Sequence, residues 1–268
     1  MKFYNQTKVK NSILDFFYSG SPDPIREGAF YDKNKEEIRR KHPDKGKDSV
    51  LVIDSEETLA KALNSGARSF YGSYWRYSEP SKTSGVIGRD LLWTIEAKDG
   101  GLKVAKKITN LFLESLESEG FPQPLVKYSG EVGFDILLPM EDLQITSKDH
   151  LSFLSDLHSE LTEYSSEYIE ERTQFDAQEK KSGIRFLGDM GTCFLTERRW
   201  RRGLLLAPMS LHPSSGLVSV PVRPSEIPEF SVIDATPEKV RPRDWNFAGR
   251  KTGLKTSFKP DAVSSSSV

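Results

Sequence analysis

Apolar residues recur at the spacing of an α-helix in four parts of the chain. In each part, side chains three and four positions apart would form one apolar stripe that packs against the rest of the protein. Asp54 or Ser55 can cap the second helix, which we expect to end near Gly66. The expected helices are residues 11–18, the stretch between Ser55 and Gly66, residues 102–119 and residues 147–173.

The longest of these helices carries its apolar stripe at alternating spacings of three and four residues. We expect this stripe to pack on a sheet, and the alternative is a seam between two copies of the chain. The residues of the stripe are Leu154, Leu157, Leu161, Tyr164 and Tyr168.

Short apolar runs between the helices predict β-strands. The expected strands are residues 50–53, 68–75, 91–97, 124–128, 134–138 and 217–222. The glycine-bearing loop between the fourth and fifth runs indicates a hairpin. Two polar stretches, 33–48 and 78–90, predict a solvated helix with its loop and a second loop. Helices that interrupt a mostly antiparallel sheet are typical of the α+β class, with the helices on one face.

Composition and charge exclude several classes of protein. The 38 lysines and arginines balance 39 acids, so any phosphate binding must come from local patches rather than from a basic coat. Cys193 is the single cysteine, which excludes an intramolecular disulfide and a multi-cysteine zinc site. No apolar run approaches the ~20 residues that span a bilayer, and the first ten residues lack the apolar segment of a signal peptide. We therefore expect a soluble, cytoplasmic protein without a membrane partner.

One strand and one loop carry residues that could act on phosphates. Thr94 and Glu96 lie two apart on the strand 91–97 and share a face, where two carboxylates could hold a pair of metal ions. Only one of the two is a carboxylate here. The glycines of the loop 127–133 allow backbone amides to approach phosphate oxygens. A surface glutamate and an ordinary turn are the structural alternatives.

Two basic segments are candidates for nucleic-acid contacts. The first places four cations around one indole, as Arg198, Arg199, Trp200, Arg201 and Arg202. The second, residues 236–259, has a net charge of +5 and includes Arg250 and Lys251 among interleaved aromatic residues. The first could instead be a solvated helix face, and the second could wrap the domain or dock on an acidic partner.

Taken in order, these segments resemble the catalytic small subunit of the archaeal and eukaryotic DNA primase superfamily. That superfamily includes the polymerase domain of bacterial end-joining ligases. The resemblance runs from about Arg26 to Val222. It rests on residues 71–75, 88–97 (GRDLLWTIEA), 127–130 (KYSG) with 133–134, and 207–212 (APMSLH) with 216–221 (GLVSVP). The last pair of stretches is the most specific.

The resemblance implies a primase-polymerase fold, with an RRM-like, mostly antiparallel sheet and flanking helices. Active members of the superfamily use three aspartates and two divalent metal ions to join nucleotides on a DNA template. The acid positions of the family read Thr94, Glu96 and, near the third, Phe194 in this chain. Asp135 stands where the family has a histidine that holds the incoming triphosphate. These departures affect the positions that would bind the metal ions and the triphosphate, so we expect little polymerase activity.

Other positions of the family motifs remain able to contact a nucleotide. Serine hydroxyls and backbone amides could bind phosphates, and a lysine and a histidine could supply charge. These candidates are Lys127, Ser129, Gly130, Ser210 and His212. A rearranged site of Glu96, Asp135 and Asp189 could hold Mg²⁺ or Mn²⁺ if the protein is active, and no zinc is expected.

The leading hypothesis is a primase-like protein that binds nucleotide or nucleic acid in DNA replication or repair, with lost or weak polymerase activity. Its expected partners are DNA or RNA, an NTP, and a primase large subunit or another replication protein. The alternatives are an active nucleotidyltransferase with a rearranged metal site and a non-catalytic interaction module.

We expect a catalytic-fold domain over 1–222, with parts 1–90 and 91–222. A proline-rich basic extension over 223–262 and a disordered tail over 263–268 would follow.

Overall fold

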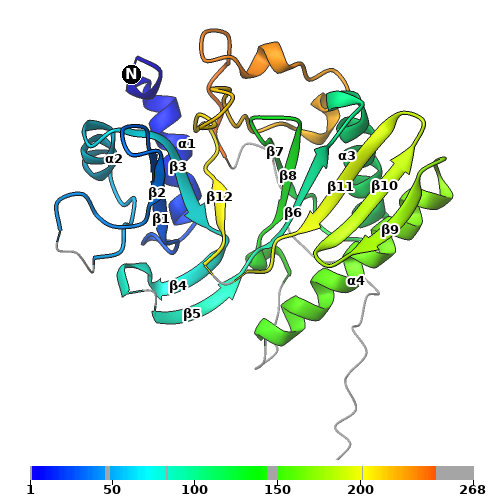
Figure 1. Cartoon of the computed structure of the whole chain (residues 1–268). Helices are drawn as coiled ribbons and strands as arrows, with labels where there is room; N and C mark the ends of the chain where they lie inside the picture. The colour runs from blue at the N-terminus through cyan, green and yellow to red at the C-terminus, as the bar shows by residue number, and fades with distance from the viewer. Residues whose placement is uncertain (1, 46–48, 83, 144–149, 201, 246–268) are drawn as a thin grey trace, which may run out of the picture.

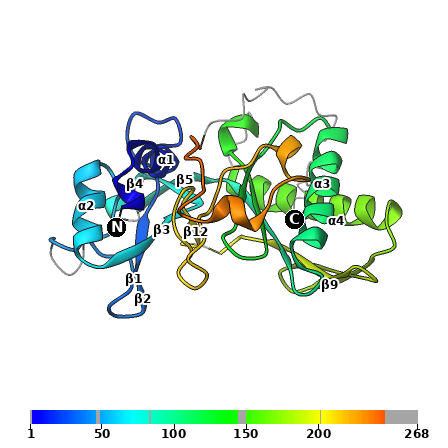
Figure 2. The same cartoon turned by 90° about the horizontal axis from the view of Figure 1, so that it is seen from above.

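Two antiparallel sheets form two lobes that stand side by side (Figure 1). The computed structural model describes residues 2–45, 49–82, 84–143, 150–200 and 202–245. Figure 2 shows helices α1 and α2 at one end of the molecule and α3 and α4 at the other. Every strand pair within the described ranges is antiparallel, which confirms the predicted α+β class.

The smaller lobe is a four-stranded sheet with two helices. Its strands, in spatial order, are β12 (Leu204–Leu206), β3 (Ala67–Ser73), β1 (Gly28–Asp32) and β2 (Glu37–Arg39). Its helices are α1 (Thr7–Tyr18) and α2 (Glu56–Asn64). Ser55 caps α2, as predicted, because its hydroxyl accepts a hydrogen bond from the Thr58 backbone N–H. Phe16 and Phe17 bury the apolar face of α1 in the core.

The larger lobe is a six-stranded sheet whose two helices cover one face. Its strands, in spatial order, are β7 (Leu125–Tyr128), β8 (Gly133–Leu138), β6 (Leu91–Ala97), β11 (Gly191–Glu197), β10 (Gly183–Gly188) and β9 (Asp176–Lys180). The helices α3 (Gly101–Ser118) and α4 (His150–Glu171) pack on this sheet and on each other. The predicted hairpin between β7 and β8 is confirmed.

The apolar stripe of α4 packs within the chain. Leu154, Leu157 and Leu161 are buried in the common core. The Trp93 indole N–H of β6 donates to the Thr162 hydroxyl of α4 at 2.8 Å, which fixes the helix on the sheet. The prediction that this stripe covers a sheet is therefore confirmed for its three leucines, whereas Tyr164 and Tyr168 are only partly buried and contact each other.

A two-stranded hairpin, β4 (Trp75–Glu79) with β5 (Ser84–Arg89), joins the lobes, so the prediction of a loop over 78–90 was wrong. Hairpin pairing satisfies the backbone of a stretch whose polar composition suggested a loop. The fully buried carboxylate of Asp90 ties the hairpin to the smaller lobe, because it accepts hydrogen bonds from both Arg26 and Arg76.

Three further predictions of secondary structure were wrong. The stretch 33–48 forms no helix in its described part, since β1 turns into β2 within it. Residues 50–53 and 217–222 lie outside every sheet ladder. Isolated bridges hold both stretches: Val50 pairs with Lys41, Val218 with Leu211 and Pro221 with Lys127. Their apolar residues are buried by core packing rather than by pairing in a sheet.

Residues 223–245, the C-terminal strap, cross from one lobe to the other over the top of the molecule in Figure 1. The strap contains the short 3-10 turns Pro224–Glu226 and Val232–Ala235. Phe230 packs on Tyr128 and Phe134 of the larger lobe, with ring centroids 5.0 and 5.9 Å apart. Trp245 packs on Phe16 of α1 at 5.8 Å. The strap is thus part of the common core. No helix in the described ranges is long and apolar enough to cross a membrane.

Candidate functional site

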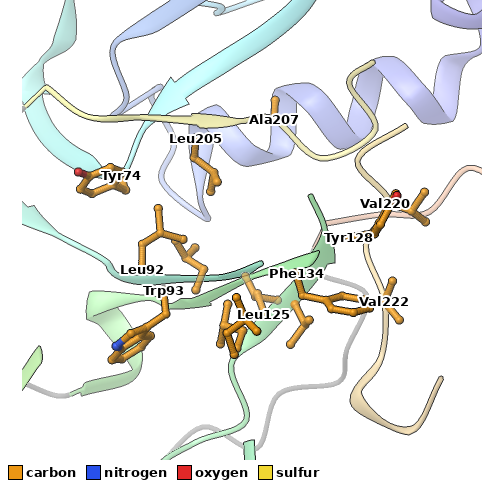
Figure 3. Close-up of a cluster of buried hydrophobic side chains, with 14 of the residues drawn as sticks. Tyr74, Leu92, Trp93, Leu125, Tyr128, Phe134, Leu205, Ala207, Val220 and Val222 are labelled. Carbon is orange, nitrogen blue, oxygen red and sulfur yellow. The ribbon is translucent and has the colours of Figure 1, made fainter. Parts of the chain in front are cut away.

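A cavity of about 170 Å³ lies between the two lobes. Figure 3 shows Leu205 of β12 and Leu92 of β6 pointing toward each other across this space. Most of the polar lining comes from β6, β8 and the loops that follow β7, β11 and β12. It consists of Thr94, Glu96, Ser129, Glu131, Asp135, Arg198 and His212. The structure therefore brings together six of the residues that the sequence singled out, namely Thr94, Glu96, Ser129, Asp135, Arg198 and His212.

A buried ion pair lies at the base of this cavity. The Lys127 ammonium of β7 lies 2.5 Å from Asp135 Oδ2 on the neighbouring strand β8 and donates to the Ser219 hydroxyl at 2.9 Å. The side chain of Lys127 is completely buried, and that of Asp135 is 8% exposed. Burial lowers the pKa of Lys127, and Asp135 opposes that shift. Because the two residues face each other across a hairpin, its register could have revealed the pair.

Thr94 and Arg198 complete the hydrogen bonds around Asp135. The Thr94 hydroxyl donates to Asp135 Oδ1 at 2.9 Å and accepts from Arg198 Nε at 3.1 Å. Both oxygens of Asp135 thus have a donor within the protein. Burial, and next the nearby charge of Asp135, raise the pKa of Glu96, which lies on the same strand as Thr94.

The three acid positions of the primase pattern share one face of the sheet, but their side chains do not fit a pair of metal ions. Thr94 lies opposite Asp135, and Glu96 lies opposite Phe194 on β11. An apolar ring therefore stands beside the only carboxylate of that set. Asp135 is already neutralised by Lys127. The donor set does not offer the clustered free carboxylates that divalent ions require.

The predicted metal set of Glu96, Asp135 and Asp189 does not come together. Asp189 lies in the turn between β10 and β11, about 10 Å along β11 from the residue that faces Glu96. It lines a different cavity, with Lys107 and Phe175. Among the described residues there is no group of three or more His, Cys, Asp or Glu side chains that could hold a metal ion.

The loop after β7 lies directly against His212. Gly130 has φ +96°, and a Cβ at this position would lie 2.7 Å from the Cβ of His212, so only glycine fits without strain. Ser215 donates from its hydroxyl to the Gly130 carbonyl at 2.5 Å. Burial lowers the pKa of His212, and Glu131, 3.9 Å from its Nδ1, opposes that shift. A neutral imidazole at neutral pH follows from the direction of this shift.

Ser210 lies outside the cavity lining. Its hydroxyl is fully buried, accepts a hydrogen bond from the Phe70 backbone N–H at 2.7 Å and lies 3.4 Å from the Tyr4 hydroxyl. This bonding fixes the segment 207–212 against the smaller sheet. The structure thus places Ser210 in a supporting position, whereas Ser129 and His212 line the cavity.

The basic segment 198–202 leaves the sheet at the end of β11 and is not helical in its described part. Trp200 is 76% exposed. Arg199 pairs with Glu197, and Arg202 donates to the buried Glu27 at 2.6 and 3.1 Å. Arg201, Arg250 and Lys251, and the predicted disordered tail, lie outside the described residues.

Sequence reasoning missed three groups at this site. Tyr71 and Glu131 line the cavity, and Glu27 forms ion pairs with Arg202 and Arg40. Tyr71 lies on a predicted strand, but only the pairing of β12 with β3 places it here. Glu27 carried no signal, because an acid before an apolar strand is ordinary in sequence.

Comparison with solved structures finds the polymerase domain of ligase D from Mycobacterium tuberculosis, determined in complex with DNA. The TM-score is 0.56 at 14% sequence identity, and the match covers 84% of this chain and 83% of that chain. Comparisons with models of protein families and with curated proteins find no match. The chain therefore has a primase-polymerase-like fold, as the sequence predicted.

Proposed function

We propose that this protein binds single-stranded nucleic acid on a primase-polymerase-like fold and lacks metal-dependent polymerase activity. The observation that carries the proposal is the buried ion pair between the Lys127 ammonium and Asp135 Oδ2 inside the sheet. Lys127 already neutralises this carboxylate, and two of the three positions where the primase pattern has an acid, Thr94 and Phe194, carry no charge.

A metal ion at Asp135 would have to displace a buried ammonium. The displaced charge of Lys127 would then have no ionic partner in an apolar interior, a state that typically costs several kcal/mol. Thr94 and Phe194 add no carboxylate that could compensate. We therefore expect no second ion to be held where polymerase chemistry needs it.

A nucleic-acid strand fits the site better than a free nucleotide does. The cavity, about 170 Å³, is smaller than the roughly 300–1,000 Å³ of common small-molecule sites. Glu96 and Glu131 on its wall would repel a triphosphate. The end of β11 is followed by Arg198, Arg199 and the exposed indole of Trp200, which a strand could contact. The DNA bound to the similar polymerase domain supports the same ligand class.

Primer extension tests the absence of polymerase activity. A primed template and all four NTPs or dNTPs would be incubated with the full chain and Mg²⁺ or Mn²⁺, beside a Glu96→Ala variant. We expect no extension from either protein. Extension by the wild type that Glu96→Ala abolishes would overturn the proposal in favour of an active nucleotidyltransferase.

Fluorescence anisotropy with a labelled oligo(dT) strand tests the binding. Because the Trp200 side chain is exposed, Trp200→Ala should leave the fold intact and weaken binding about 5- to 100-fold. Ile233→Ala, which removes another exposed apolar side chain, is the matched control and should bind as the wild type does. Absence of wild-type binding at about 50 mM salt, where binding to phosphates is favoured, would overturn the proposal.

A further inference from the structure

The six-stranded sheet has one face that its helices leave open. Side chains alternate between the two faces of a strand. On β11, Cys193 and Leu195 are buried on the side of α3 and α4, whereas Phe194 and Thr196 are only partly buried on the other side. The face that carries Phe194 is thus the accessible one.

An aromatic ring and a guanidinium form the centre of this open face. Phe194 lies directly between Glu96 on β6 and Arg185 on β10 in the sheet register. The Arg185 guanidinium carbon lies 5.9 Å from the centroid of the Phe194 ring. Within the described part of the chain, the buried Nε of Arg185 has no hydrogen-bond partner. An unpaired donor beside an aromatic ring is an arrangement that a ligand could complete.

Charge on this face favours an anionic ligand. Arg185 on β10 pairs with Gln178 on β9, and Lys180 lies two residues further along β9, so both cations are on this face. Arg198 reaches the same face through its hydrogen bond to Thr94. The acids of this face are Asp176, Glu96 and Asp135, and Asp135 is already paired with Lys127, so three cations face two unpaired acids. Phosphates could therefore pair with the cations while a base stacks on the ring.

We propose that Phe194 is a base-stacking platform for single-stranded nucleic acid and that Arg185 contacts the adjacent phosphate or base. This inference rests on the proposed function and locates its strand on the open sheet face, next to the cavity. Aromatic side chains on exposed sheets stack unpaired bases in a sequence-tolerant way. A duplex keeps its bases stacked on each other and cannot use the platform. In this chain the position that the primase pattern reserves for an acid has become a contact for a base.

Binding of oligo(dT) to variants of the full chain tests the platform. Phe194→Leu keeps an apolar side chain but removes the ring, and we expect binding about 5- to 100-fold weaker. Phe194→Tyr keeps the ring and should bind as the wild type does. Arg185→Gln should weaken binding and reduce the slope of log affinity against log salt by about one. Lys103→Gln, on the exposed side of α3, is the matched charge control.

A strand that contains 2-aminopurine gives a readout that a merely structural role would not change. Stacking on Phe194 should quench its fluorescence in the wild type and in Phe194→Tyr, but not in Phe194→Leu. Wild-type affinity and quenching in Phe194→Leu, with binding still lost in Trp200→Ala, would overturn the platform and leave the proposed function intact. Loss of binding in Phe194→Leu together with loss of the folded circular dichroism spectrum would assign Phe194 to the core and also overturn the platform.

Discussion

Lys127 and Asp135 face each other across the β7–β8 hairpin and form an ion pair that the protein almost completely encloses. The pair lies at the base of the cavity, beneath the residues that the primase pattern would use for metal ions. Its two charges neutralise each other, so the site is stable without an external cation. This relationship links the stability of the sheet to the chemistry that the site can perform.

Lys127→Met should destabilise the protein by about 3–5 kcal/mol, because it leaves the Asp135 carboxylate buried without a cation. The double variant Lys127→Met/Asp135→Leu removes both charges and should recover at least half of that loss, since apolar replacements of buried pairs are often tolerated. Chemical denaturation of both variants measures the difference. A double variant less stable than Lys127→Met would show that the pair itself, rather than charge neutrality, stabilises the sheet.

Glu96→Gln should stabilise the folded protein at neutral pH. Burial and Asp135 raise the pKa of Glu96 in the folded state, so this state binds the proton more tightly than the unfolded chain does. The wild type therefore loses stability as pH rises from the unfolded pKa through the folded one, and the variant does not. Its advantage should vanish below about pH 4, where Glu96 is protonated in both states. Denaturant midpoints across this range measure it. A variant less stable at every pH would mean that the ionised carboxylate is favourable here.

Local patterns predicted the elements that carry their own signal. The apolar stripes of α3 and α4, the Ser55 cap and the β7–β8 hairpin follow from spacing, capping chemistry and a glycine-bearing loop. The cavity residues Ser129, Asp135 and His212 were found for the same reason, because they sit in short motifs. Such motifs do not predict which residue each side chain contacts in the folded protein.

Pairing between strands, rather than a signal within each strand, defines the elements that the sequence analysis missed. β9 and β10 are mostly polar on their open face and lack a continuous apolar run, so only their ladder with β11 defines them. Conversely, residues 217–222 have a clear apolar run but meet no complete partner strand. Ser210 belongs to a specific motif, yet its role depends on Phe70, 140 positions away.

Ser210→Ala should lower stability by about 1–3 kcal/mol, because it leaves the buried Phe70 N–H without an acceptor. Binding of oligo(dT) should be unchanged, since the hydroxyl faces the core. Ser129→Ala is the matched comparison: this serine lines the cavity and its hydroxyl accepts a longer bond, 3.3 Å, from the Glu131 N–H, so a smaller loss of stability is expected. Denaturation and anisotropy on both variants separate the roles. Weakened binding by Ser210→Ala at wild-type stability would place this serine at the ligand after all.

Phe230→Ala should destabilise the protein by about 3–5 kcal/mol, because it opens a cavity where the C-terminal strap meets Tyr128 and Phe134. Ile233, in the same strap, is 55% exposed, so Ile233→Ala should change stability by no more than about 0.5 kcal/mol. Urea denaturation of the two variants, together with proteolysis under native conditions, tests whether the strap is part of the folding unit. Because the strap also reaches Phe16 through Trp245, its release should expose both lobes to cleavage at lower urea. If Phe230→Ala were as mild as Ile233→Ala, the strap would be an appendage that the two lobes do not need.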